Sequence, residues 1–209
     1  MTDNVANPMP NVVSGNPCPF LRALVANAII DGRSIALDEI ARKIVAISAL
    51  PGDPSALPFG KIRFVALIAH GLAPWALWRT AREGLRPEGL RDGPLDKHGA
   101  GSRTLDVEGR FQEAEFGRLA AFGGDKRDDA GAIEPGLDSA DIVRMMDANF
   151  ERAKGARRAI DRKLMDGEWP VLLQVMGKGT GAARYLSVAE LRALIQERRL
   201  PARLVARVG

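Results

Sequence analysis

The chain has one cysteine, one tyrosine and two histidines among 209 residues. A single cysteine excludes an internal disulfide, which is consistent with a reducing compartment. The formal net charge is +4, but the basic residues are spread among acidic ones. They do not alternate with aromatic residues, and no recognised nucleic-acid-binding motif is present. We therefore predict that nucleic acid is not a partner.

The sequence also predicts no signal peptide. Residues 1–15 are polar, without the basic and apolar regions of a secretion signal, so we predict a cytoplasmic protein with a flexible N-terminal arm over 1–15. Hydrophobic residues make up 46% and charged residues 27% of the chain, which is typical of a globular protein. The length suits one domain, which we place at 16–205.

The single cysteine lies between two prolines, in Pro17-Cys18-Pro19, and an amphipathic helical pattern follows it. Pro19 suits the first helical position, so Cys18 is the expected N-cap residue. A sulfur at a helix N-terminus lies near unpaired backbone N–H groups and the positive end of the helix dipole. It can be a metal ligand or a nucleophile. The structural alternative is a small buried side chain at a helix start.

This segment, with Leu21, Leu24, Asn27 and residues 31–35 (Asp-Gly-Arg-Ser-Ile), resembles the proximal motif of the haem-thiolate peroxidases. This is the family of the fungal chloroperoxidases and unspecific peroxygenases, of which the chain would be a divergent, bacterial-type member. The resemblance implies a haem b cofactor, with Cys18 as the axial ligand of the iron and Pro17 and Pro19 beside it. The fungal members are secreted, so the resemblance does not extend to location.

A second motif is expected in the glycine-rich stretch 84–110, which reads as a long loop. Lys97-His98-Gly99-Ala100 and the later Asp106 resemble the family's Glu-His-Asp segment. Lys97 stands where the family has a metal-binding glutamate, and the resemblance then implies that it pairs with a haem propionate. His98 is a candidate to assist proton transfer. The alternative is a surface loop with an incidental histidine.

The main candidate for proton transfer is Glu168, in the segment Glu168-Trp169-Pro170 before a late apolar run. The family has a catalytic glutamate on a late helix, and splitting peroxide requires a group that accepts and releases a proton. A carboxylate at the start of a surface helix is the alternative. His70 is a minor candidate.

Residues 64–78 are the most apolar part of the chain, but Gly71 and Pro74 interrupt them and they are too short for a good membrane span. A core helix kinked at Pro74, or a wall of the haem pocket, is the favoured interpretation. Because basic residues lie on both sides, contact with a membrane surface is a second possibility.

Every periodic segment is helical and no strand-like alternation appears. We therefore predict an all-α, single-domain helical bundle around a haem pocket, with a polar loop over 123–137 and a long helix that begins near Asp138, with Asp141 as its capping partner. The predicted function is a peroxidase or peroxygenase that uses hydrogen peroxide to oxidise a small organic substrate or a halide. The alternatives are a haem-binding or sensing module without turnover, and an interaction protein on the same fold.

Overall fold

The computed structural model describes residues 16–48, 57–91, 103–155 and 157–208. Lys97 and His98 lie outside these ranges. The helices, including the 3₁₀ helices η1 and η2, are α1 (Pro19–Ala26), α2 (Leu37–Ser48), α3 (Phe59–Ile68), α4 (Pro74–Glu83), η1 (Pro87–Leu90), α5 (Glu113–Ala120), α6 (Ser139–Arg152), α7 (Asp161–Met165), α8 (Trp169–Met176), η2 (Gly181–Ala183), α9 (Val188–Gln196) and α10 (Ala202–Val205). The strands are β1 (Gly124–Arg127), β2 (Ile133–Asp138) and β3 (Tyr185–Ser187).

The prediction of an all-α fold was wrong, because the described residues contain a three-stranded antiparallel sheet in the order β1-β2-β3. The expected polar loop over 123–137 is a β-hairpin. Its turn forms around Asp128, whose Oδ1 accepts from the backbone N–H of Ala130 (3.0 Å) and Ala132 (2.8 Å). Gly131 adopts φ +87°, in the left-handed region that glycine enters without strain.

The third strand lies about fifty residues further along the chain, and Leu137 of β2 pairs with Leu186 of β3. Gly136 lets the aromatic ring of Tyr185 pack against the backbone of β2. A methyl group at Gly136 would lie only 2.3 Å from Cδ2 of that ring. The close fit depends on a residue without a side chain at this position.

The helix starts predicted from local signals were confirmed. Asp138 is the N-cap of α6. Its carboxylate accepts from the Asp141 N–H at 2.9 Å, and the Asp141 carboxylate accepts from the Asp138 N–H. The two groups form a capping box. The helix α6 ends at Arg152. Gly155 has φ +98° just beyond the C-terminus, where a right-handed helix cannot continue.

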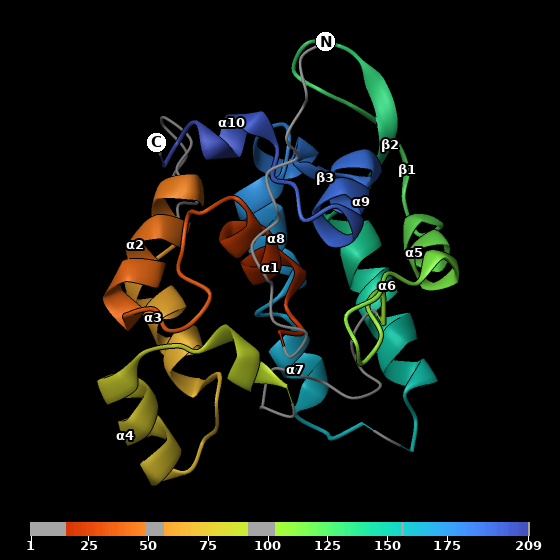
Figure 1. The fold of residues 1–209 in the computed structure, drawn as a ribbon. Helices are drawn as coiled ribbons and strands as arrows, with labels where there is room; N and C mark the ends of the chain where they lie inside the picture. The colour runs from red at the N-terminus through yellow and green to blue at the C-terminus, as the bar shows by residue number, and fades with distance from the viewer. Residues whose placement is uncertain (1–15, 49–56, 92–102, 156, 209) are drawn as a thin grey trace, which may run out of the picture.

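The apolar run 64–78 does not form one kinked helix. It is divided between α3 and α4, with a turn that contains Gly71 at φ +152°. Pro74 is at the start of α4, where its missing N–H leaves no helical hydrogen bond unmade. In Figure 1 this helical hairpin projects at the side of the molecule opposite the sheet and α5.

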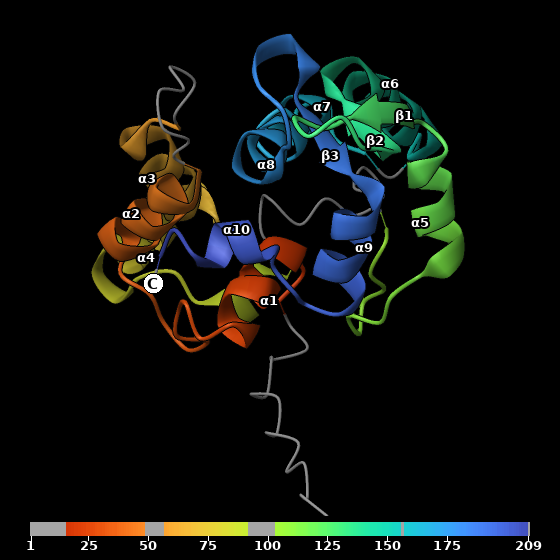
Figure 2. The same ribbon diagram turned by 90° about the horizontal axis from the view of Figure 1, so that it is seen from above.

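A single apolar core joins the two sides of the molecule. It includes Leu24 of α1, Ile40 of α2, Met145 of α6 and Leu191 of α9, all at most 1% exposed. Figure 2 shows α2, α3 and α4 on one side of the molecule and the sheet with α5 to α9 on the other. In the described residues, no helix is long and apolar enough to cross a membrane.

Candidate functional site

Cys18 occupies the N-cap of α1, as predicted. Its backbone is extended (φ −87°, ψ 110°), and Pro19 follows at the first helical position. The Cys18 carbonyl accepts from the Arg22 N–H at 3.0 Å and begins the helix. The thiol does not cap the helix. Cys18 is half-buried and packs against the edge of the apolar core.

Two buried polar side chains lie next to this cysteine in the chain. Asn16 is 2% exposed, and its Oδ1 accepts from the Cys18 N–H at 3.0 Å. Arg22, one turn into α1, is 4% exposed, and its Nη1 donates to the Gly109 carbonyl at 2.9 Å. Nevertheless, Asn16 Nδ2 and Arg22 Nε have no hydrogen-bond partner within the described part of the chain. Because a buried donor without an acceptor costs about 1–3 kcal/mol, this pair of donors favours an acceptor-bearing ligand beside Cys18.

The Arg22 guanidinium also lacks sufficient countercharge. Burial lowers the pKa of Arg22, and the positive charges of Arg198 and Arg91 lower this pKa further, while Asp106 and Cys18 act in the opposite direction. A lowered pKa means that the folded chain disfavours the cationic form. An anion bound here would reverse that effect.

A tight turn brings residues 106–110 against α1. Asp106 Oδ1 accepts from the backbone N–H groups of Glu108 (2.9 Å) and Arg110 (2.8 Å). Gly109 has φ +76°, and a Cβ atom there would lie 2.8 Å from Nη1 of Arg22. The glycine therefore allows its carbonyl to approach the buried guanidinium. As a result, the turn that begins at Asp106 of the second predicted motif contacts the helix of the first.

The carboxylate of Asp106 is committed to this turn. Hydrogen bonds from the backbone and then the side chain of Arg110 lower the pKa of Asp106, and Arg110 Nε lies 2.9 Å from Oδ2. The group stays ionised at neutral pH. It is a countercharge for the arginines rather than a carrier of protons.

Glu168 lies at the start of α8. It is the half-buried N-cap residue of α8, where its carbonyl accepts from the Leu172 N–H at 2.8 Å and its side chain does not cap the helix. Glu168 therefore lies at a helix start, as the structural alternative expected, but the helix is largely buried rather than on the surface. The interpretation of Glu168 as the acid–base group remains a prediction. The same holds for Lys97 and His98, which are outside the described residues.

His70 is placed by the structure in a different role from the one considered for it. Its Nε2 accepts from the Arg86 N–H at 2.9 Å, so the ring proton is on Nδ1, which donates to the Gly89 carbonyl at 3.0 Å. Burial lowers the pKa of His70, and the positive charges of Arg86 and Arg79 lower it further. The hydrogen bond to the Gly89 carbonyl raises this pKa but does not outweigh them. With both nitrogens bound to backbone, His70 joins the end of α3 to η1 and is not free to ligate a metal.

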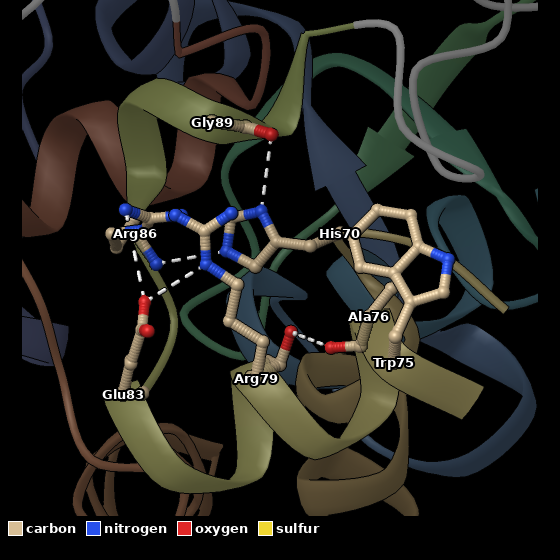
Figure 3. A pocket seen from close by; sticks show the side chains of 9 residues that line it. His70, Trp75, Ala76, Arg79, Glu83, Arg86 and Gly89 are labelled. Atoms are coloured by element: carbon tan, nitrogen blue, oxygen red, sulfur yellow. Dashed lines mark hydrogen bonds and ion pairs between the residues drawn. The ribbon is translucent and has the colours of Figure 1, made fainter. Parts of the chain in front are cut away.

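A hollow of about 180 Å³ lies beside His70. Figure 3 shows Trp75 on one side of it and the side chains of Arg79, Glu83 and Arg86 on the other. The Glu83 carboxylate lies 3.0 Å from Arg79 Nε and 3.8 Å from Arg86 Nη1. Cys18 does not line this hollow.

Sequence reasoning missed a polar cluster at the sheet, centred on Glu134 of β2. Its carboxylate accepts from Lys178 Nζ (2.5 Å), Tyr185 OH (2.8 Å) and Ser187 Oγ (2.9 Å). Tyr185 and Ser187 are two apart on β3 and so share one face of the strand. The spacing of Tyr185 and Ser187 is the only sequence signal for this cluster, and in a strand of three residues it is too short to be recognised. The cluster fixes β3 against β2.

Comparisons with known proteins give no relative for this chain. No protein-family model matches it, and neither a curated protein nor a solved structure is significantly similar. The functional assignment therefore depends on the residues themselves.

Proposed function

We propose that Cys18 is the axial thiolate ligand of a haem b iron, and that the protein is a peroxidase or peroxygenase that oxidises a small organic substrate or a halide with hydrogen peroxide. The observation that carries the proposal is the pair of unpartnered buried donors, Asn16 Nδ2 and Arg22 Nε, beside a cysteine at a helix N-terminus. The resemblance of Pro17-Cys18-Pro19 to the haem-thiolate motif gives the ligand its identity.

The donor set fits such a group. In the described residues, no three His, Cys, Asp or Glu side chains gather as a metal site. Haem suits a single protein ligand because the macrocycle supplies the other four donors. Its two carboxylates would be acceptors for Arg22 Nε and Asn16 Nδ2, and the positive charges of Arg91 and Arg198 would add to the attraction there.

Each residue then has a defined task. The N-terminus of α1 and the Arg22 charge favour the thiolate form of Cys18. Pro17 and Pro19 restrict the backbone on both sides of the ligand. Haem iron bound by a thiolate supplies the peroxide-activating chemistry. Glu168, with His98, is proposed to hold and transfer a proton at the peroxide oxygens. Lys97 is proposed to pair with a haem carboxylate.

The ligand is tested by adding haemin to the purified protein and recording the spectrum of the reduced carbon monoxide complex. A thiolate ligand gives a strongly red-shifted Soret band, which Cys18→Ala should abolish and Cys18→His should convert to a histidine-type band. Variants of residues 17–19 are compared with wild type by circular dichroism, so that loss of fold is distinguished from loss of ligand. A Cys18→Ala protein that keeps the shifted band would refute the proposal.

A haem-binding or sensing module without turnover is the second candidate. It is favoured by the described cluster around Cys18, whose one carboxylate, Asp106, is held ionised by Arg110. Peroxide turnover with a general peroxidase substrate separates the two candidates. If Glu168 transfers the proton, Glu168→Gln should slow the reaction of the haem protein with peroxide about 10²–10⁴-fold without loss of haem. Haem binding without turnover in wild type would favour the second candidate.

A further inference from the structure

The hairpin of α3 and α4 exposes aromatic side chains to solvent. All four exposed aromatic residues of the chain lie there: Phe59, Phe64, Trp75 and Trp78. The other seven aromatic residues are buried or half-buried. Trp75 and Trp78 are 68% and 62% exposed, and Leu72 in the connecting turn is 57% exposed. A concentration of large apolar side chains on one surface marks an interaction site.

Helix α4 buries Ala76 and Thr80 and exposes both of its tryptophans. Ala76 and Thr80 face the protein, whereas Trp75, Trp78 and Arg82 recur at helical spacing on the outer side. The guanidinium of Arg82 lies 5.3 Å from the centroid of the Trp78 ring. A helix that only covered the core would show the reverse pattern.

The hairpin also carries the excess positive charge of the whole protein. Residues 59–86 contain five basic residues and one acidic residue, a net charge of +4, which equals the formal net charge of the chain. The rest of the chain therefore contains equal numbers of basic and acidic residues. Arg63 pairs with Asp38 at 2.6 Å, and Arg79 and Arg86 share Glu83. Within the described ranges, Lys61 and Arg82 form no ion pair, so their charges are available to a partner.

We propose that this hairpin docks on the surface of an anionic lipid bilayer, with Trp75 and Trp78 at the level of the headgroups and Lys61 and Arg82 on lipid phosphates. Tryptophan suits this depth because its ring is apolar and its N–H is polar. Basic side chains add attraction to anionic lipid. The docking is peripheral, since neither of these two ten-residue helices is long enough to cross a bilayer.

The same charge argues against a second copy of the chain as the occupant. Two hairpins face to face would bring together two surfaces of net charge +4, and such like-charge contact is unfavourable. An anionic bilayer has the opposite sign and offers an apolar layer for the indole rings. The inference does not depend on haem binding, because the hairpin residues named here are not part of the cluster around Cys18.

The test is co-sedimentation of the protein with phosphatidylcholine vesicles, with and without phosphatidylglycerol. We expect binding only to the anionic vesicles, weakened by high salt because exposed charges are screened. Trp75→Ala/Trp78→Ala should abolish it. The matched control, Val107→Ala/Ile133→Ala, removes two equally exposed apolar side chains elsewhere (73% and 61% exposed) and should bind normally.

A second pair of variants tests the charges. Lys61→Gln/Arg82→Gln should weaken binding by about fivefold per residue, whereas Lys154→Gln/Lys163→Gln, exposed lysines on another part of the chain, should do so much less. All eight substituted positions are exposed, so circular dichroism and the thermal midpoint should not change. Emission of Trp75 and Trp78 should shift to the blue on anionic vesicles, while that of buried Trp169 should not.

Three outcomes would overturn the proposal. The first is equal binding to neutral and anionic vesicles. The second is no vesicle binding at all. The third is a concentration-dependent dimer, or a complex with an acidic protein, that the tryptophan variant disrupts while vesicle binding of that variant stays at the wild-type level.

Discussion

Replacement of Arg22 by methionine tests the site at Cys18, because its effects on the empty and the ligand-bound protein should differ. In the protein without haemin, the change removes the charged hydrogen bond to the Gly109 carbonyl, which contributes about 1.5–3 kcal/mol. It also removes the unpartnered Nε, a cost of about 1–3 kcal/mol. These two contributions have opposite signs and similar size.

The free energy of unfolding of the Arg22→Met protein should therefore lie within about 1–2 kcal/mol of the wild-type value. Methionine reproduces the arginine side chain as far as the Nε position, and apolar replacement of a poorly compensated buried charge is often tolerated. Urea unfolding followed by circular dichroism measures this. Haemin affinity should fall by about 10- to 150-fold, the equivalent of one charge-assisted hydrogen bond, as measured by absorbance titration.

Arg118→Met is the matched control. Arg118 also has an unpartnered Nε, but it pairs with Glu115 at 2.9 Å, away from Cys18. This variant should lose some stability and keep its haemin affinity. If Arg22→Met destabilised the protein by more than about 3 kcal/mol and left haemin affinity at the wild-type level, Arg22 would be a structural residue and the argument from its unpartnered donor would be wrong.

Two further predictions concern pH. Burial opposes the ionisation of Glu134, but hydrogen bonds from Lys178, Tyr185 and Ser187 outweigh it and lower the pKa of Glu134 below 4.5. The resulting stabilisation is complete above pH 4.5 and is lost as the pH falls toward the folded-state pKa. Glu134→Gln should remove this dependence and cost about 1–3 kcal/mol at neutral pH, and an unchanged acid unfolding curve would contradict it. For His70 the lowered pKa means that the folded protein favours the neutral form, whereas for Glu134 it favours the charged form. The contribution of neutral His70 to the free energy of unfolding is complete above pH 6.5 and decreases below it. The His70→Ala protein should therefore lose less stability than wild type between neutral and mildly acid pH, whereas the control His98→Gln should lose as much as wild type.

The sequence predicted the parts of the structure that depend on neighbouring residues. The start of α1 follows from Cys18 and Pro19, and the start of α6 from Asp138 and Asp141, because a cap and the N–H groups that it satisfies are at most three residues apart. The position of Cys18 at a helix N-terminus was predicted in the same way.

The candidate site as a whole was only partly predictable. Arg22 follows Leu21 in an apolar helix face, and nothing local shows that its guanidinium is buried or that it meets Gly109, eighty-seven positions away. The predicted partners of Cys18 were taken from motifs. The structure adds Asn16 and Arg22 to them, and it places Asp106 of the second motif close enough to Arg22 to raise its pKa.

The sheet and the exposed tryptophans were decided by tertiary structure alone. Strand β1 reads Gly-Asp-Lys-Arg and has no apolar alternation, so only its pairing with β2, and the pairing of β2 with β3, makes it a strand. The apolar character of residues 64–78 predicted a core segment, but a helix can bury only the face that the rest of the chain covers. On α4 that face carries Ala76 and Thr80, and Trp75 and Trp78 are left outside. Local sequence determines where a helix begins, whereas the contacts that choose its buried side come from residues far along the chain.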